Sequence, residues 1–191
     1  MSISTNKDHF KRLIEVYSPL IKLLIESNQI YTDIDEPIKW CFAWDDNVSI
    51  TATVNRITNV LSINLAFVDA AFKCNKVYEI EYFILHEIRH IYQHIQIVLY
   101  KDGKSEIGEE YIKRWIVEGE NYIKSLDKDG NENIKYFKQD CELDAYAFSY
   151  AVMHHKYSGK YDSLLYLPEL YGEELKSVFD LAVRDFLEGI Q

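Results

Sequence analysis

The chain is poor in the residues that interrupt regular secondary structure. Its 191 residues include only 7 glycines and 3 prolines, and no internal repeat or low-complexity tract is present. This composition argues against collagen-like and disordered chains and favours a folded, helix-rich protein. Residues 1–191 are expected to form a single domain, because this length suits one well-buried core.

Cysteine is scarce as well, with Cys41, Cys74 and Cys141 as the only three. Their odd number, their wide spacing and the lack of a C-x-x-C pair argue against a disulfide framework and against a zinc knuckle. We expect all three to be small buried side chains.

Basic residues and long apolar runs are also lacking. The 21 Lys and Arg residues are outnumbered by 31 Asp and Glu residues, which gives a net charge of −10. Because phosphate backbones and anionic lipids attract clustered Lys and Arg, we expect no nucleic-acid partner and no membrane attachment. No apolar run reaches the roughly 18 residues of a membrane span, and the first residues lack the pattern of a secretory signal. A cytoplasmic location is expected, and a toxin or effector secreted without such a signal stays open as an alternative.

Apolar residues at three- and four-residue spacing predict an amphipathic helix from residue 8 to about residue 28. Pro19 interrupts this pattern, so either a kink or a second helix capped by Ser18 is expected there. The segment 125–134 resembles a calcium-binding loop but has Glu132 where such a loop requires glycine, so a solvated turn is expected. Further helices are predicted at residues 79–100, 109–126, 136–155 and 173–187, with a loop at 101–108 and an irregular stretch at 157–171.

Three β-rich runs, at residues 38–44, 49–55 and 59–65, precede the helix at 79–100. In the second run Ile50, Ala52 and Val54 alternate with polar residues, which is typical of a strand with one buried face. Short polar links between the runs predict an antiparallel meander. The fold class is therefore expected to be α+β and mostly helical, with a small antiparallel sheet packed on the helix at 79–100.

That helix contains the motif H-E-I-R-H, from His86 to His90. Histidines four residues apart lie on one face of a helix, so both imidazoles can reach one tetrahedral metal ion. A catalytic zinc ion usually has three protein ligands and keeps one position for water. Glu142, in the helix predicted at 136–155, is the best candidate for the third ligand. Glu87 is the candidate general base.

Other polar residues on these two helices are candidates for supporting roles. His94 lies one further turn along the histidine face, where it can be an extra ligand or, in preference, a hydrogen-bonding residue that lines the pocket. For Glu87 the non-catalytic alternative is a solvent-facing acid, and for His154 it is a surface position near the helix end. The residues that can stabilise an oxyanion or hydrogen-bond the ligands are His94, Tyr146, Tyr150 and His154.

The segments LHEIRHIYQ and ELDAYAFSY resemble the H-E-x-x-H and E-x-x-A-x-x-F-A motifs of the ImmA/IrrE-type metallopeptidases and related compact gluzincins. The resemblance covers about residues 59–153. It implies a zincin-like domain in which His86, His90 and Glu142 bind Zn²⁺ and Glu87 is the general base.

Two features depart from related families. Thermolysin-like members have an aspartate four residues after the third ligand, where it orients a ligand histidine. Here Tyr146 holds that position and Asp144 lies two residues after Glu142, so the groups that support the ligand histidines are unassigned. The metzincin pattern does not fit either, since Gln93 and Gln96 occupy the places of its glycine and third histidine.

The predicted function is zinc-dependent hydrolysis of a peptide bond in a protein or peptide substrate, with Glu87 as the general base. The alternative is a non-catalytic or regulatory metal-binding protein that senses or binds a protein partner, because the ImmA/IrrE-type proteins often act on or alongside transcriptional regulators. A fourth protein ligand such as His94 favours this alternative, whereas an open coordination position beside Glu87 favours the enzyme. The sequence indicates neither the particular substrate nor the oligomeric state.

Overall fold

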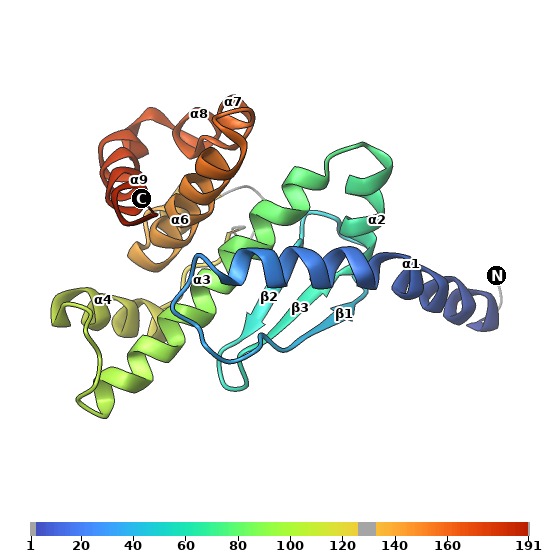
Figure 1. Cartoon of the computed structure of the whole chain (residues 1–191), viewed down its shortest axis with the longest axis horizontal. Coiled ribbons are helices and arrows are strands. Elements are labelled where there is room, and N and C mark those ends of the chain that lie inside the picture. Colours follow the sequence, from blue (N-terminus) through green and yellow to red (C-terminus); the bar gives the residue numbers. More distant parts are fainter. Residues whose placement is uncertain (1–2, 126–132, 191) are drawn as a thin grey trace. The chain divides into compact units, whose positions relative to one another are not determined.

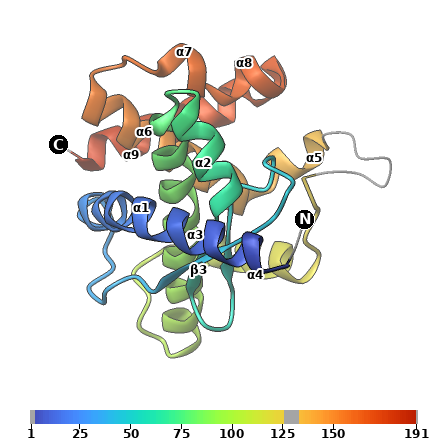
Figure 2. The same cartoon turned by 90° about the vertical axis from the view of Figure 1, so that its right-hand side faces the viewer.

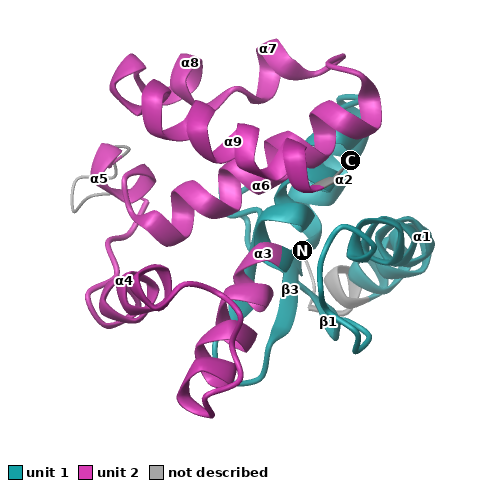
Figure 3. Cartoon of the chain, turned by 60° about the vertical axis from the view of Figure 1, so that its left-hand side comes forward, with its two compact units in different colours: residues 1–88 teal, residues 89–191 magenta. Residues whose placement is uncertain are grey.

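Helices form most of the chain in the computed structural model, which describes residues 3–125 and 133–190. The mostly helical α+β class is therefore confirmed. Contacts divide the chain into two compact units, residues 1–88 and 89–191, shown in different colours in Figure 3. The predicted turn at 125–134 falls mainly on residues 126–132, which lie outside the described residues.

Helix α1, Ile3–Gln29, is one continuous helix with Pro19 inside it. The Oγ atom of Ser18 donates a hydrogen bond to the carbonyl oxygen of Ile14 at 2.6 Å, so Ser18 is a helical residue and not the cap of a new helix. The alternative of a second helix starting at Pro19 is therefore wrong. The buried stripe that holds α1 continues on both sides of the proline, through Leu13, Tyr17, Ile21, Leu24 and Ile25.

Three short strands follow α1 and form a mixed sheet in the order β1-β3-β2 (Figure 1). Strand β1 spans Trp40–Ala43, β2 spans Ala52–Asn55 and β3 spans Val60–Asn64. The antiparallel pairing of β2 with β3 agrees with the predicted meander, but β1 pairs with β3 in parallel. The predicted antiparallel sheet is thus wrong for β1. In β2 the side chains alternate between half-buried and exposed as expected, whereas Ile50 before it is exposed.

The side chain of Asn64, at the end of β3, explains why β2 lies on the opposite side of β3 from β1. Its Nδ2 donates to the carbonyl oxygens of Asp45, Asn47 and Ile50 at 3.0, 3.2 and 2.7 Å. Its Oδ1 accepts from the Asp45 N–H at 3.1 Å. The buried amide therefore holds the loop after β1 against the end of β3, so β2 starts beside β3 and not beside β1.

The same Asn64 Oδ1 accepts from the N–H of Ala66 and caps helix α2, Leu65–Lys73. Helix α3, Val77–Lys101, then matches the helix predicted at 79–100 (green in Figures 1 and 2). Its side chains from Ile80 to Ile88 are nearly all buried, but from His94 onward they are half-buried or exposed. The helix is therefore buried around the motif and partly exposed over its last turns.

Among its described residues, the second unit has helices joined by loops and no strand. After the second part of α3 come α4 (Glu109–Glu120), α5 (Ile134–Phe137), α6 (Asp140–Tyr157), α7 (Asp162–Leu165), α8 (Leu167–Tyr171), the 3₁₀-helix η1 (Glu173–Leu175) and α9 (Lys176–Ile190). Helix α9 packs along α6, and α7 and α8 are short turns in the connection between them (Figures 2 and 3).

Three predictions for this unit are wrong in detail. The helix predicted at 109–126 ends at Glu120, and the helix predicted at 136–155 is split into α5 and α6. The stretch 157–171, expected to be irregular, contains α7 and α8. The last predicted helix is confirmed as η1 followed by α9.

Side-chain hydrogen bonds to the backbone explain the break before α6. The amide of Gln139 accepts from the Ile123 N–H at 2.9 Å and donates to the Ile123 carbonyl at 3.0 Å. Glu118 of α4 accepts from the N–H groups of Asp140 and Cys141 at 2.7 and 2.9 Å. These are the first two N–H groups of α6, so the carboxylate caps the helix and faces the positive end of its dipole.

Replacing Glu118 with alanine should weaken the start of α6. Both N–H groups lose their acceptor, and the expected loss is about 1–2 kcal/mol in the free energy of unfolding, the usual size of a helix cap. Urea unfolding followed by far-UV circular dichroism measures this. Glu120→Ala, at an exposed position two residues further on, is the matched control and should cost less than about 0.5 kcal/mol. Equal losses in the two variants would contradict the capping role.

The cysteine prediction is confirmed only for Cys141, which is buried. Cys41 and Cys74 are exposed, and all three are free thiols. In the described ranges, no helix has both the length and the apolar character needed to cross a bilayer.

Candidate metal centre

The motif residues of α3 are largely removed from solvent. His86 is 3% exposed and Glu87 is 9% exposed, while His90 is half-buried. The interpretation of Glu87 as a solvent-facing acid is therefore wrong. Burying a polar group without hydrogen-bond partners costs about 1–3 kcal/mol, so a core helix rarely carries such residues for packing alone.

Glu142 lies in the first turn of α6 and is 1% exposed. His86, His90 and Glu142 each offer one ligand atom, and these atoms all lie within 4.8 Å of one another. The Nε2 atom of His90 and the Oε1 atom of Glu142 are 3.4 Å apart. Two ligands of a tetrahedral zinc ion, each about 2.0–2.2 Å from the metal, lie about 3.3–3.6 Å from each other. The three predicted ligands are thus brought together at a spacing that one metal ion can bridge.

The other ring nitrogen of His90 has a partner on its own helix. Its Nδ1 lies 2.8 Å from the Oε1 of Gln93, which is one turn further along α3. The Nε2 of Gln93 donates to the carbonyl oxygen of Cys141 at 2.8 Å and to the Oδ2 of Asp144 at 2.7 Å, both on α6. Gln93 therefore connects a candidate ligand of α3 to the helix that carries Glu142.

Asp144 also forms an ion pair with Arg89, the fourth residue of the H-E-I-R-H motif. The Nε and Nη2 atoms of Arg89 donate to the two carboxylate oxygens of Asp144 at 2.8 and 3.0 Å. The two side chains are 13% and 19% exposed, so this two-pronged ion pair is mostly shielded from water. The guanidinium also lies over the rings of Tyr92, Phe148 and Phe186.

The sequence contains a signal for this pair that motif reasoning missed. Arg89 lies between buried positions of a core helix, and a buried arginine needs an acidic partner. The position of Asp144, two residues after Glu142, does not match the thermolysin-like aspartate, so that comparison predicts no partner for it. The spacing of Arg89, His90 and Gln93 on one helix and of Glu142 and Asp144 on another is the pattern that could have indicated the network.

Tyr122 is a further residue that sequence reasoning did not connect with the site. Its hydroxyl donates to the Oε1 of Glu142 at 2.8 Å. The helix predicted at 109–126 includes Tyr122, but α4 ends before it and the residue lies in the following loop. Burial raises the pKa of Tyr122 well above its usual value, and the Glu142 carboxylate raises it further. The phenol therefore remains a hydrogen-bond donor at every physiological pH.

Two of the proposed supporting residues do not join the three-residue group. His94 is half-buried on α3 and is not a member. Tyr146 is buried in an aromatic cluster, with its ring 6.4 Å from that of Tyr136 and 5.7 Å from that of Phe137. The roles predicted for His94 and Tyr146 stay predictions.

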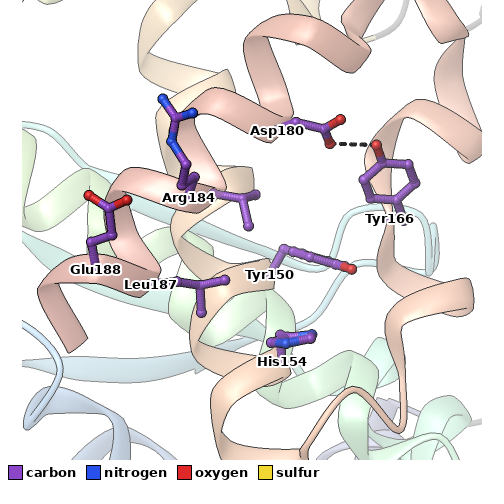
Figure 4. A pocket seen from close by; sticks show the side chains of 8 residues that line it. Tyr150, His154, Tyr166, Asp180, Arg184, Leu187 and Glu188 are labelled. Atoms are coloured by element: carbon purple, nitrogen blue, oxygen red, sulfur yellow. Dashed lines mark hydrogen bonds between the residues drawn. The ribbon is translucent and has the colours of Figure 1, made fainter. Parts of the chain in front are cut away.

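Tyr150 and His154, the other two candidates, line a separate hollow of about 460 Å³ between α6 and α9 (Figure 4). The Nδ1 of His154 lies 2.9 Å from the carboxylate of Asp162, and the hydroxyl of Tyr166 donates to Asp180 across the same hollow. Burial and the neighbouring Asp162 raise the pKa of Tyr150 to about 12. The supporting role predicted for Tyr150 and His154 stays a prediction.

The donor set fits a borderline metal ion. Two imidazoles and one carboxylate suit zinc and similar first-row ions, whereas magnesium and calcium prefer oxygen ligands alone. The group is assembled from two helices whose backbones are held by their own hydrogen bonds. The group of His86, His90 and Glu142 could therefore hold such an ion.

No family model, curated protein or solved structure that was compared with the chain matches it. The resemblance to the ImmA/IrrE-type metallopeptidases stays a prediction from two short motifs.

Proposed function

We propose that the chain is a zinc-dependent peptidase. The observation that supports this is the convergence of His86, His90 and Glu142. The buried Glu87 lies beside His86 on α3. A set of two histidines and one glutamate is used by catalytic zinc sites in peptidases, whereas structural zinc sites have four ligands and are usually rich in cysteine. Among the described residues, no fourth His, Cys, Asp or Glu joins the group.

In this proposal each residue around the metal site has a separate role. A zinc ion supplies Lewis-acid chemistry, since it polarises an amide carbonyl and makes water more acidic. Glu87 would accept a proton from the attacking water and pass it to the leaving amine. Tyr122 holds the Glu142 carboxylate through its hydroxyl, and Gln93 holds the His90 ring. The burial of His86, Glu87 and Glu142 limits competition from bulk water.

Removal of the metal should abolish hydrolysis reversibly. The purified protein is expected to contain one zinc ion per chain, and a fluorogenic peptide library should be cleaved by it. Treatment with 1,10-phenanthroline should remove zinc and activity together, and added Zn²⁺ should restore both. Metal content by atomic absorption and cleavage rate on the same samples are the measurements.

The outcomes separate the two candidate functions. Stoichiometric zinc without cleavage of any library member would favour the regulatory metal-binding alternative. Cleavage that persists after the metal has been removed would contradict zinc-dependent hydrolysis.

A further inference from the structure

The contacts of Gln93 point to a role in metal binding for a residue outside the H-E-I-R-H motif. We propose that Gln93, held by Asp144, is a positioning residue that keeps the proton of His90 on Nδ1 and so makes Nε2 the metal-binding atom. The proposal rests on metal binding at the site formed by His86, His90 and Glu142, as proposed above. It assigns a purpose to the pair of Arg89 and Asp144, which the hydrolytic reaction does not use directly.

The orientation of the Gln93 amide follows from its partners. One end of the amide faces the Cys141 carbonyl oxygen and the Asp144 carboxylate, at 2.8 and 2.7 Å. Both groups are acceptors only, so the NH₂ group must be at that end. The oxygen Oε1 is then at the other end, 2.8 Å from the Nδ1 of His90. An amide oxygen cannot donate, and the hydrogen bond therefore requires the proton to be on Nδ1.

The proton position decides which nitrogen can bind a metal. A neutral imidazole has one N–H and one lone pair, so a proton on Nδ1 leaves the lone pair on Nε2. Nε2 is the atom that lies 3.4 Å from Glu142 Oε1, inside the three-residue group. The hydrogen bond to Gln93 thus presents the correct lone pair and also limits rotation of the ring.

Asp144 and Arg89 hold the glutamine in this orientation. The Oδ2 of Asp144 accepts from Gln93 and also from the Nε of Arg89, and its Oδ1 accepts from the Nη2 of Arg89. The guanidinium compensates the carboxylate charge, and the aromatic rings around it restrict its movement. Gln93 is 2% exposed, so water does not compete for its amide.

The test is the zinc affinity of the full-length Gln93→Met variant, measured by competition with a chromophoric chelator. Methionine is similar in length but lacks the amide oxygen that accepts from His90 and the NH₂ group that donates to Asp144. The dissociation constant for zinc should rise by about 10–100-fold, the usual effect of losing such a partner. Gln96→Met removes the same group one turn further along α3, where Gln96 accepts from Ser105; this control should stay within about twofold of the wild type.

A double-mutant cycle tests whether Asp144 acts through Gln93. Asp144→Asn should also weaken zinc binding, because an amide cannot accept from Gln93 and from both nitrogens of Arg89. The double variant should bind zinc no more weakly than Gln93→Met alone. Fully additive losses would overturn the proposed relay. If Gln93→Met does not fold, as judged by circular dichroism, wild-type affinity in Asp144→Asn overturns the proposal instead.

The position of the proton can be observed directly. In the metal-free wild type, a long-range ¹H–¹⁵N spectrum of the histidine rings should show neutral His90 with its proton on Nδ1. A proton on Nε2, or wild-type zinc affinity in a folded Gln93→Met variant, overturns the role of Gln93 and leaves the proposed function intact. Failure of the wild-type protein to bind zinc contradicts the proposed function itself.

Discussion

The Glu87→Gln variant should lose about 10²–10⁴-fold in the rate of peptide hydrolysis while its zinc stays bound. Glutamine has the same shape as glutamate, but its amide cannot take up a proton from water. Glu87 does not belong to the group of His86, His90 and Glu142, so its replacement leaves the ligands in place. The measurements are kcat/KM on the best library peptide and the metal content of the same preparation.

Glu79→Gln is the matched control for this experiment. Glu79 lies in the first turn of the same helix and pairs with Lys76, away from the motif. Surface pairs of this kind contribute about 0–1 kcal/mol, so both the activity and the zinc content should be close to those of the wild type. Activity of Glu87→Gln equal to that of the control would exclude Glu87 as the general base.

The His90→Ala variant should bind zinc more than about 100-fold more weakly than the wild type, because loss of a ligand exceeds the 10–100-fold effect of losing a supporting partner. The same direction is expected for His86→Ala and Glu142→Ala. The measurement is the chelator competition described for Gln93→Met, on protein whose fold is verified by circular dichroism. Hydrolysis should fall in parallel, because all three residues serve the same ion.

His155→Ala is the control for the ligand variants. His155 is exposed near the end of α6 and lies outside the group of candidate ligands. Its replacement should leave the zinc affinity within about twofold of the wild type, as is usual for surface positions. Stoichiometric, tightly bound zinc in all three ligand variants would contradict the assignment of the metal centre.

The candidate ligands could be predicted because their signal is local. Two histidines at helical spacing must lie on one face wherever the helix packs, and α3 forms as predicted. Glu142 required one more assumption, that its helix approaches α3, which is common in zinc sites built from two helices. The short distance between His90 and Glu142 agrees with that assumption.

The partners of the ligands could not be predicted because they depend on tertiary contacts. Tyr122 reaches Glu142 only because α4 ends early, and that end is followed by a loop bonded to Gln139. Asp144 on α6 bonds to Arg89 and Gln93 on α3, a contact between two helices that neither helix encodes alone. Periodicity reports which face of a helix is buried, but it does not report which polar groups on different helices meet.

The pairing of β1 in the sheet also could not be predicted from local sequence patterns. Alternation of apolar and polar residues predicted the strands, yet the pairing of β1 was wrong. A short polar link between strands normally indicates a hairpin. Here the link after β1 is held by Asn64, a residue about twenty positions downstream, so the local pattern could not reveal the crossing.

The two strand pairs of the sheet differ in how far apart their partners lie in the sequence. Strands β2 and β3 are joined by a four-residue turn, residues 56–59, in which the Oδ1 of Asn55 accepts from two backbone N–H groups. This pairing is local and requires little loop closure. Strand β1 pairs Cys41 with Ser62, 21 residues away, and the loop after β1 is also bonded to Asn64 at the end of β3. Because local pairs need less loop closure, we expect the β2–β3 hairpin to form before β1 joins the sheet.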